Sequence, residues 1–219
     1  MEIAKYIVLF LALFLFSCSS NRDNENLKKL VDLYLNQNNK NEIIEITEEK
    51  IKHINYPIIE IRTNGMLSQG VFLPMTTRDN YINWTSGIGQ IVTLDGGSIT
   101  KTYGMDVYLN SLEIENINPF NNKTNLNFWP ENIEKTYKFV QPNYEELKIS
   151  VKCRLTKENR EKIYLLEKQY NFLKVKESCY NKSFVFTNYY WVNSSGFIWK
   201  SKQWISPNGV YANIYVLKK

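Results

Sequence analysis

The chain offers few residues for acid–base or nucleophilic chemistry. Its 219 residues include one histidine, His53. One imidazole cannot supply a Ser-His-Asp triad with a spare histidine, an HExxH zinc helix or a multi-histidine metal centre. We expect His53, in a short helix before Pro57, to be partly buried with a backbone partner rather than to act as an acid–base group.

A pair of carboxylates is the second candidate. Glu113 and Glu115 are two positions apart, so a strand would present both on one face, as glycoside cleavage could use. Charges that alternate along a solvated strand give the same pattern more often. We therefore predict no catalytic residue, no metal ligand and no cofactor.

The first twenty residues predict export and lipidation. After Lys5, the apolar run 6–16 would reach only about 16 Å as a helix, against about 30 Å for a bilayer core, which is typical of a cleaved signal peptide. Leu15-Phe16-Ser17-Cys18 resembles a bacterial lipobox, although an ordinary signal peptide with a cysteine is the alternative. We expect residues 1–17 to be removed and Cys18 to carry acyl chains such as palmitate, which anchor the protein in a membrane. Ser19, in place of a retaining Asp, favours the outer membrane, with the protein facing the periplasm.

Export changes the meaning of Cys153 and Cys179. In an oxidising compartment two such residues favour a disulfide, with a zinc half-site or two free thiols as alternatives. We expect Cα atoms about 4.4–6.8 Å apart and a polar turn at 156–162 inside the loop that the disulfide closes.

Aromatic residues are the best lead to a binding surface. They make up 14% of the chain, and flat rings stack on sugars while neighbouring polar groups satisfy hydroxyls. The alternative is core packing. The candidate glycan or partner surface is Trp84, Tyr190, Trp191, Trp199, Lys202, Gln203 and Trp204.

The elements that position these residues are mainly strands. An apolar stripe predicts a helix over 24–37, and Thr47 is a predicted N-cap of a second, short helix. From residue 58 the period changes to two, Asp95-Gly96-Gly97 predicts a hairpin, and 116–132 predicts a long loop. We expect residues 18–219 to form one mainly β domain, an antiparallel curved sheet or barrel with short N-terminal helices.

Net charge excludes one class of partner. The chain carries a formal charge of +5, from 27 basic and 22 acidic residues that are scattered along it. Nucleic-acid binding would need a concentrated basic patch, so we expect no nucleic-acid partner.

Two stretches, with the lipobox, resemble the GfcB/YjbF family of capsule and exopolysaccharide lipoproteins, which has a YmcC-like fold. The first runs from Tyr56-Pro57 through Trp84 to the strand–glycine-turn–strand segment 91–104. The second, 190–204, is similar to the family's C-terminal hairpin, and Val216-Leu217-Lys218-Lys219 fits its ending. The chain departs from the family at Ser98 and Lys202, where arginine is common, and at Asn193, where the family has an acid.

The resemblance implies a barrel-like outer-membrane lipoprotein associated with polysaccharide assembly and export. Our leading hypothesis is a non-enzymatic accessory factor whose partners are the membrane, the polysaccharide and export-machinery proteins. The alternative is a periplasm-facing carrier of lipid or lipoprotein, which would need an apolar cavity that opens at one mouth. A glycan-active enzyme using Glu113 ranks third.

Overall fold

The computed structural model describes residues 46–64, 69–105, 108–121 and 124–219. The predicted signal peptide, Cys18 and the predicted helix 24–37 lie outside them. The short helix α3 (Glu48–Ile51) begins where the sequence predicts, because the Thr47 side chain accepts the N–H of Lys50 at 3.4 Å. Among the described residues, helices are all too short or too polar to cross a membrane.

Strands make up most of the described chain, and their bounds follow the alternating pattern. The first group is β1 (Ile58–Thr63), β2 (Gln69–Arg78), β3 (Tyr81–Ser86), β4 (Ile91–Asp95) and β5 (Ser98–Tyr103). The second group is β6 (Leu109–Ile114), β7 (Asn132–Val140), β8 (Glu146–Leu165), β9 (Lys168–Tyr180), β10 (Val185–Val192), β11 (Ile198–Trp204) and β12 (Tyr211–Lys218). The segment between β6 and β7 holds the short 3₁₀ helix η2 (Leu126–Phe128).

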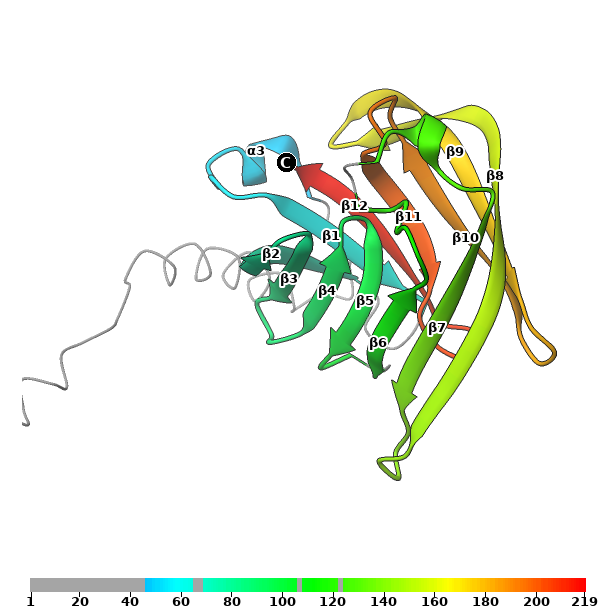
Figure 1. Ribbon diagram of the computed structural model, residues 1–219. Helices are drawn as coiled ribbons and strands as arrows, with labels where there is room; N and C mark the ends of the chain where they lie inside the picture. The colour runs from blue at the N-terminus through cyan, green and yellow to red at the C-terminus, as the bar shows by residue number, and fades with distance from the viewer. Residues whose placement is uncertain (1–45, 65–68, 106–107, 122–123) are drawn as a thin grey trace, which may run out of the picture. The chain divides into compact units, whose positions relative to one another are not determined.

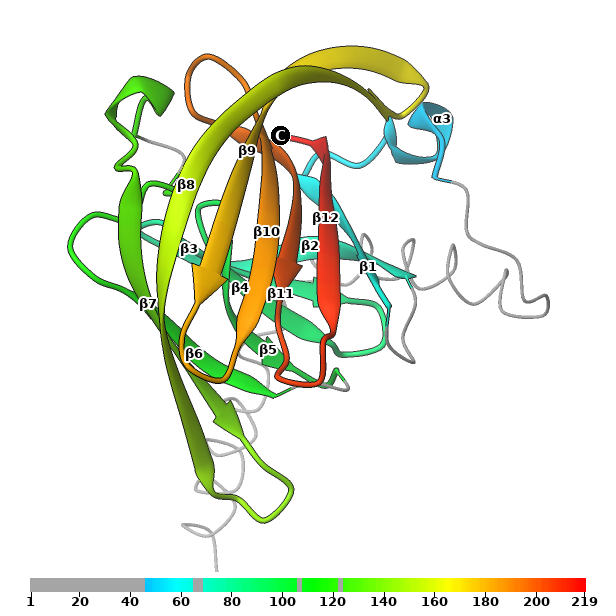
Figure 2. The same ribbon diagram turned by 90° about the vertical axis from the view of Figure 1, so that its right-hand side faces the viewer.

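All these strands join one antiparallel sheet that curls into a nearly closed barrel (Figures 1 and 2). The strand order is β5-β4-β3-β2-β1-β12-β11-β10-β9-β8-β7-β6, so pairing of β1 with β12 unites the two groups. The end strands β5 and β6 have no ladder between them, but the N–H of Leu109 donates to Thr102 Oγ1 at 3.0 Å. We call this contact line the seam. The predicted fold class, a mainly β curved sheet or barrel, is confirmed.

The β8–β9 hairpin differs from the prediction. No turn lies at 156–162: β8 continues to Leu165, and the chain reverses at Leu166 and Glu167, both with positive φ. A register shift between Lys157 and Arg160 absorbs the irregularity. Residues 156–162 are polar because the β8–β9 ladder extends there beyond the body of the barrel into solvent, and not because the chain turns. The end of this hairpin arches over β10–β12 toward α3, where Lys168 pairs with Glu48 at 2.7 Å (Figure 2).

Alternation divides the buried side chains between two clusters. The main core fills the barrel with residues such as Ile59, Val92, Tyr137 and Val175. A second cluster lies where the arching hairpin meets the sheet, and its buried members are Ile163, Leu165, Phe172 and Trp191. The sheet is therefore covered on both faces near the hairpin.

The segment 115–131 holds two glycine turns together. Gly97 N–H donates to the carbonyl of Phe120 at 2.7 Å in the β4–β5 turn. A Cβ on Gly196, in the β10–β11 turn, would lie 2.2 Å from the carbonyl oxygen of Thr124. A Cβ on Gly96, next to Gly97, would likewise lie 2.2 Å from the carbonyl oxygen of Phe120. Gly96 and Gly196 belong to the two stretches that resemble the capsule lipoprotein family, and their lack of a side chain lets one loop pack on both hairpins.

Candidate functional site

The structure places most of the predicted aromatic surface inside the protein. Trp84 is 5% exposed and Tyr190 is completely buried. Trp191, Gln203 and Trp204 are also buried, whereas Trp199 and Lys202 are half-buried. Of the residues of the candidate glycan or partner surface, Trp199 and Lys202 are the ones with accessible side chains. Rings enclosed by protein cannot stack on a sugar outside it.

The buried rings pack against other parts of the chain. Tyr190 stacks on Phe120 with centroids 4.3 Å apart, which fixes the segment 115–131 to β10. Trp204 stacks on Phe186 at 4.1 Å. These contacts show that core packing, the alternative kept open for the aromatic residues, accounts for both side chains.

Trp191 and Trp199 belong to the second cluster. The indole N–H of Trp191 donates to Glu161 at 2.8 Å, and Lys174 pairs with the same carboxylate at 2.8 Å. These bonds lower the pKa of Glu161, Lys174 contributing most. Trp199 stands between Phe172 and Phe197, at centroid distances of 6.0 and 5.0 Å.

Gln203 links the two stretches that resemble the capsule lipoprotein family. Its Nε2 donates to the carbonyl of Gly97 at 2.7 Å, and its Oε1 accepts the N–H of Ile99 at 3.0 Å. Nε2 also donates to Ser201 Oγ at 2.9 Å. The Gln203 side chain thus reaches from β11 to the β4–β5 hairpin, and its amide is fully engaged inside the protein.

A buried ion pair, which the sequence analysis missed, lies in the barrel interior. Lys135 Nζ is 2.7 Å from Glu177 Oε1, with both side chains at most 1% exposed. Glu177 Oε2 accepts from Asn188 at 2.6 Å and from the Tyr190 hydroxyl at 3.0 Å. Burial lowers the pKa of Lys135 and the Glu177 carboxylate partly offsets this effect. The alternating pattern of β7 could have indicated that Lys135 is buried, because Lys135 shares its strand face with Tyr137 and other core residues.

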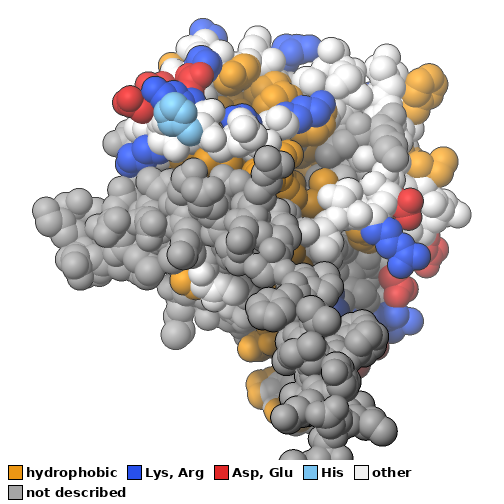
Figure 3. All heavy atoms as spheres, turned by 90° about the vertical axis from the view of Figure 1, so that its left-hand side faces the viewer, with side chains coloured by type: hydrophobic (Ala, Val, Ile, Leu, Met, Phe, Trp, Pro, Cys, Tyr) orange, Lys and Arg blue, Asp and Glu red, His pale blue; other side chains and the backbone are white. Residues whose placement is uncertain are grey.

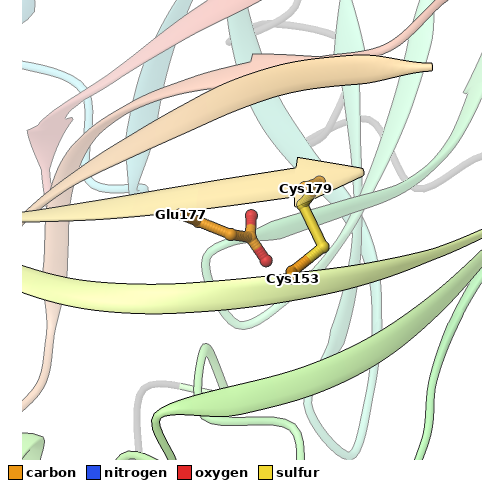
Figure 4. A group of neighbouring side chains, drawn as sticks. All are labelled: Cys153, Glu177 and Cys179. Atoms are coloured by element: carbon orange, nitrogen blue, oxygen red, sulfur yellow. A yellow bond between two sulfur atoms is a disulfide. The ribbon is translucent and has the colours of Figure 1, made fainter. Parts of the chain in front are cut away.

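The disulfide between Cys153 and Cys179 is present, as predicted (Figure 4). The expected Cα separation was wrong: it is 4.0 Å, because the residues lie directly opposite each other on β8 and β9. Directly opposed residues of antiparallel strands lie as close as about 4.5 Å. Cys153, Cys179 and Glu177 each offer one atom of a kind that can bind a metal ion, and these three atoms lie within 4.8 Å of one another. Sulfurs bonded to each other are not the thiolates that bind zinc.

The acid–base candidates lie apart from this interior network. Glu113 is exposed and binds Lys138, a hydrogen bond that lowers the pKa of Glu113, whereas a glycosidase acid needs a raised one. Glu115 follows the end of β6, so the expected placement of both on one strand was wrong. His53 is exposed, not partly buried as expected.

An apolar cavity of about 210 Å³ opens between the β3–β5 hairpins and the strands β11 and β12. It reaches the surface beside Pro57 and Lys219, both exposed. Figure 3 shows hydrophobic side chains gathered on the upper part of this side of the protein, near His53, with Lys and Arg side chains beside them. The walls of the cavity include Ile59, Trp84 and Val216. The lipid-carrier alternative required a cavity of this kind.

Comparison with known proteins assigns the family. A model of the family described as group 4 capsule polysaccharide lipoprotein gfcB, YjbF, matches residues 20–217. The chain belongs to this family. A GfcB/YjbF protein is named as a lipoprotein of capsule polysaccharide, which relates this chain to the capsule and to the cell envelope. No curated protein matches the sequence.

One solved structure, that of YmcC, supports the fold. The hypothetical lipoprotein YmcC from Escherichia coli K12 is 14% identical, with a TM-score of 0.68, over 87% of this chain and 96% of that one. A putative exported protein with a YmcC-like fold from Bacteroides fragilis is 11% identical, with a TM-score of 0.33, over 74% of this chain and 94% of that one. The similarity to YmcC shows that this GfcB/YjbF protein has the YmcC-like fold.

Proposed function

We propose that this GfcB/YjbF protein is an outer-membrane lipoprotein that assists the assembly or export of capsular or extracellular polysaccharide. The family match over residues 20–217 carries the proposal. Acyl chains on Cys18, after removal of residues 1–17, anchor residues 18–219 as one domain that faces the periplasm. The disulfide supports the export step, because such bonds persist in oxidising compartments.

The role we propose is non-enzymatic. The charged and amide groups of the Lys135–Glu177 pair and of Gln203 are engaged with other groups of the protein. Glu113, the named candidate for glycan cleavage, is exposed and bound to Lys138. An accessory role needs none of these groups to be available to a substrate.

We further propose that Trp199 and Lys202 belong to the surface that contacts the polysaccharide or an export-machinery protein. Both are half-buried, so part of each side chain is accessible. Tyr170, 37% exposed, stacks parallel to Trp199 with centroids 6.3 Å apart, which extends the aromatic face available for a sugar ring. No nucleic acid is among the proposed partners.

The test is deletion of the gene in its own host, followed by measurement of surface polysaccharide. We expect deletion to reduce it and the wild-type gene to restore it. Cys18→Ala should fail to restore it and should leave the membrane fraction, whereas Glu113→Gln should restore it fully. Unchanged capsule and biofilm matrix after deletion would reject the proposal.

A second comparison tests the surface. Trp199→Ala, at a half-buried position, should restore less polysaccharide than wild type at equal protein level. Tyr144→Ala is the control, because Tyr144 is the most exposed of the described large hydrophobic residues, at 91%, and has no ring partner among them. Equal restoration by the two variants would remove Trp199 from the surface while leaving the capsule role intact.

A further inference from the structure

We propose that the apolar cavity between β3–β5 and β11–β12 binds the acyl chain of an anionic lipid. The site shares Trp199 with the proposed polysaccharide surface, but its other walls, Trp84 included, take no part in that surface, so variants at those walls test it separately. Its walls, its size, one unpartnered donor and the charge at its mouth each bear on the occupant.

The walls favour a hydrocarbon over a sugar. Ile59, Ile82, Leu94, Ile214 and Val216 line the cavity from four strands. A sugar would bring several hydroxyls, each of which needs a hydrogen-bond partner once it leaves water. Ser201 also lines the cavity, but its Oγ already accepts from Gln203 at 2.9 Å. A chain of methylene groups makes no such demand.

The volume is large enough for part of an acyl chain. An apolar cavity of about 150 Å³ in a protein core admits benzene. This one has about 210 Å³ and opens to the surface beside Pro57, so a longer hydrocarbon segment can enter from outside.

Trp84 supplies an observation independent of the cavity's shape. It lines the cavity at 5% exposure, and its indole N–H has no acceptor among the described residues. A buried donor left without an acceptor is costly, so native proteins rarely keep one. In an acyl ester, the carbonyl oxygen can accept the indole N–H of Trp84 while the attached hydrocarbon chain fills the apolar cavity.

The charge at the mouth favours an anionic headgroup. The lining includes Lys218 and Lys219, and no described acidic side chain contributes to it. Lys218 donates to the carbonyl of Ile54, whereas the ammonium of Lys219 lies 4.3 Å from the ring centroid of Phe197. A phosphate or carboxylate at this point would accept charge-assisted hydrogen bonds from Lys219.

The test is photocrosslinking of the full chain in its own host. Cells are fed palmitic acid carrying a diazirine, which enters the membrane lipids, and are then irradiated; adducts are located by mass spectrometry after proteolysis. We expect adducts on cavity peptides, with the mass of a phospholipid or fatty acid. Adducts confined to other parts of the protein would overturn the proposal. An adduct joining a cavity peptide to the peptide of Cys18 would also overturn it, because the occupant would then be the protein's own anchor.

Matched variants separate filling of the cavity from misfolding. Val216→Trp and Ile82→Phe place larger side chains at half-buried lining positions, and both should abolish the cavity adducts. Val210→Trp is the control, because Val210 is also half-buried against the main core but does not line the cavity. Formation of the Cys153–Cys179 disulfide reports folding in each variant. Persistent adducts in folded Val216→Trp and Ile82→Phe would reject the site.

Trp84→Phe tests the ester contact. The ring stays apolar but loses its N–H, and we expect adduct yield to fall by about three- to tenfold, the effect of one buried hydrogen bond on an equilibrium. An unchanged yield would overturn the proposed role of the Trp84 donor.

Discussion

Gln203 and Ile99 lie on strands that are far apart in the sheet, yet the side-chain oxygen of Gln203 accepts the backbone N–H of Ile99 at 3.0 Å. The same amide donates to the carbonyl of Gly97. One side chain therefore satisfies two backbone groups of a hairpin that the curled sheet brings close to β11. This places Gln203, expected from the sequence to face a glycan or partner, among the residues that hold the barrel together.

Gln203→Leu should destabilise the protein by about 2–4 kcal/mol, because it leaves a buried N–H and a buried C=O without partners. Urea unfolding followed by tryptophan fluorescence measures this. Lys202→Gln, at the neighbouring half-buried position, should stay within about 0.5 kcal/mol of wild type. Equal effects of the two substitutions would contradict the role assigned to the Gln203 amide.

Lys135→Met should cost about 3–5 kcal/mol, since it leaves the buried Glu177 carboxylate without its cation. The double variant Lys135→Met/Glu177→Gln removes both charges and keeps an acceptor for Asn188 and Tyr190. It should recover much of the loss in the same unfolding measurement. A double variant as unstable as the single one would show that the charges are not what makes Lys135→Met costly.

Replacing Cys153 and Cys179 together with Ser should lower the free energy of unfolding by about 2–4 kcal/mol, mainly by freeing the unfolded chain. Thermal unfolding with and without reductant measures the effect, and reductant should not change the variant. Free reaction of both thiols of the wild-type protein with an alkylating reagent, in material from the envelope without reductant, would contradict the disulfide itself.

Gly196→Ala and Gly209→Ala form a matched pair. Both glycines have positive φ, 89° and 78°, so each alanine pays for a left-handed backbone, about 1–2 kcal/mol. The Cβ at 196 would also meet the carbonyl of Thr124, whereas the Cβ at 209 has nothing within 4 Å. Gly196→Ala should therefore be clearly the more destabilising in thermal unfolding; equal melting temperatures would contradict the close approach of the loop.

The alternating pattern in β10 correctly puts Tyr189 and Trp191 on one strand face and Tyr190 on the other. It could not show that both faces are covered. Trp191 is buried because the β8–β9 hairpin continues past the barrel and arches back, a long-range event that no local pattern encodes. The same limit applies to Gln203, whose partners lie more than a hundred residues earlier. The seam also depends on how the whole sheet closes, whereas the register of Cys153 with Cys179 depends on where the β8–β9 hairpin turns, at Leu166 and Glu167.

The Lys135–Glu177 pair was accessible to sequence reasoning. Lys135 alternates with Ile133 and Tyr137, and Glu177 alternates with Val175 and Cys179, so each charge falls on an apolar strand face. A charge in such a position predicts a buried partner. What remained beyond the sequence was that the two strands, β7 and β9, bring these faces together inside the barrel.

Glu161 should make stability depend on acidity. Its pKa is lowered in the folded protein, so its contribution is present above the ordinary value of 4.5 and is lost as pH falls through the lower folded value. Glu161→Gln should be less stable than wild type at pH 7, and the difference should shrink below pH 4.5. The partial exposure of the Glu161 side chain keeps the effect modest. Urea unfolding at several pH values measures it; a difference that grows toward acid would contradict the sign.

The seam between β5 and β6 gives the barrel a preferred line of opening. Every other neighbouring pair of strands is joined by a backbone ladder, whereas here the N–H of Leu109 bonds to a side-chain hydroxyl. Separating β5 from β6 therefore breaks no ladder, and it is opposed instead by the contacts of the β4–β5 hairpin with Gln203 and Phe120. We expect this opening to cost less free energy than the separation of two strands joined by a ladder, a difference that hydrogen exchange measures. The protein is in this respect a curled open sheet whose two end strands are held together by side chains, and not a barrel closed by a continuous ring of ladders.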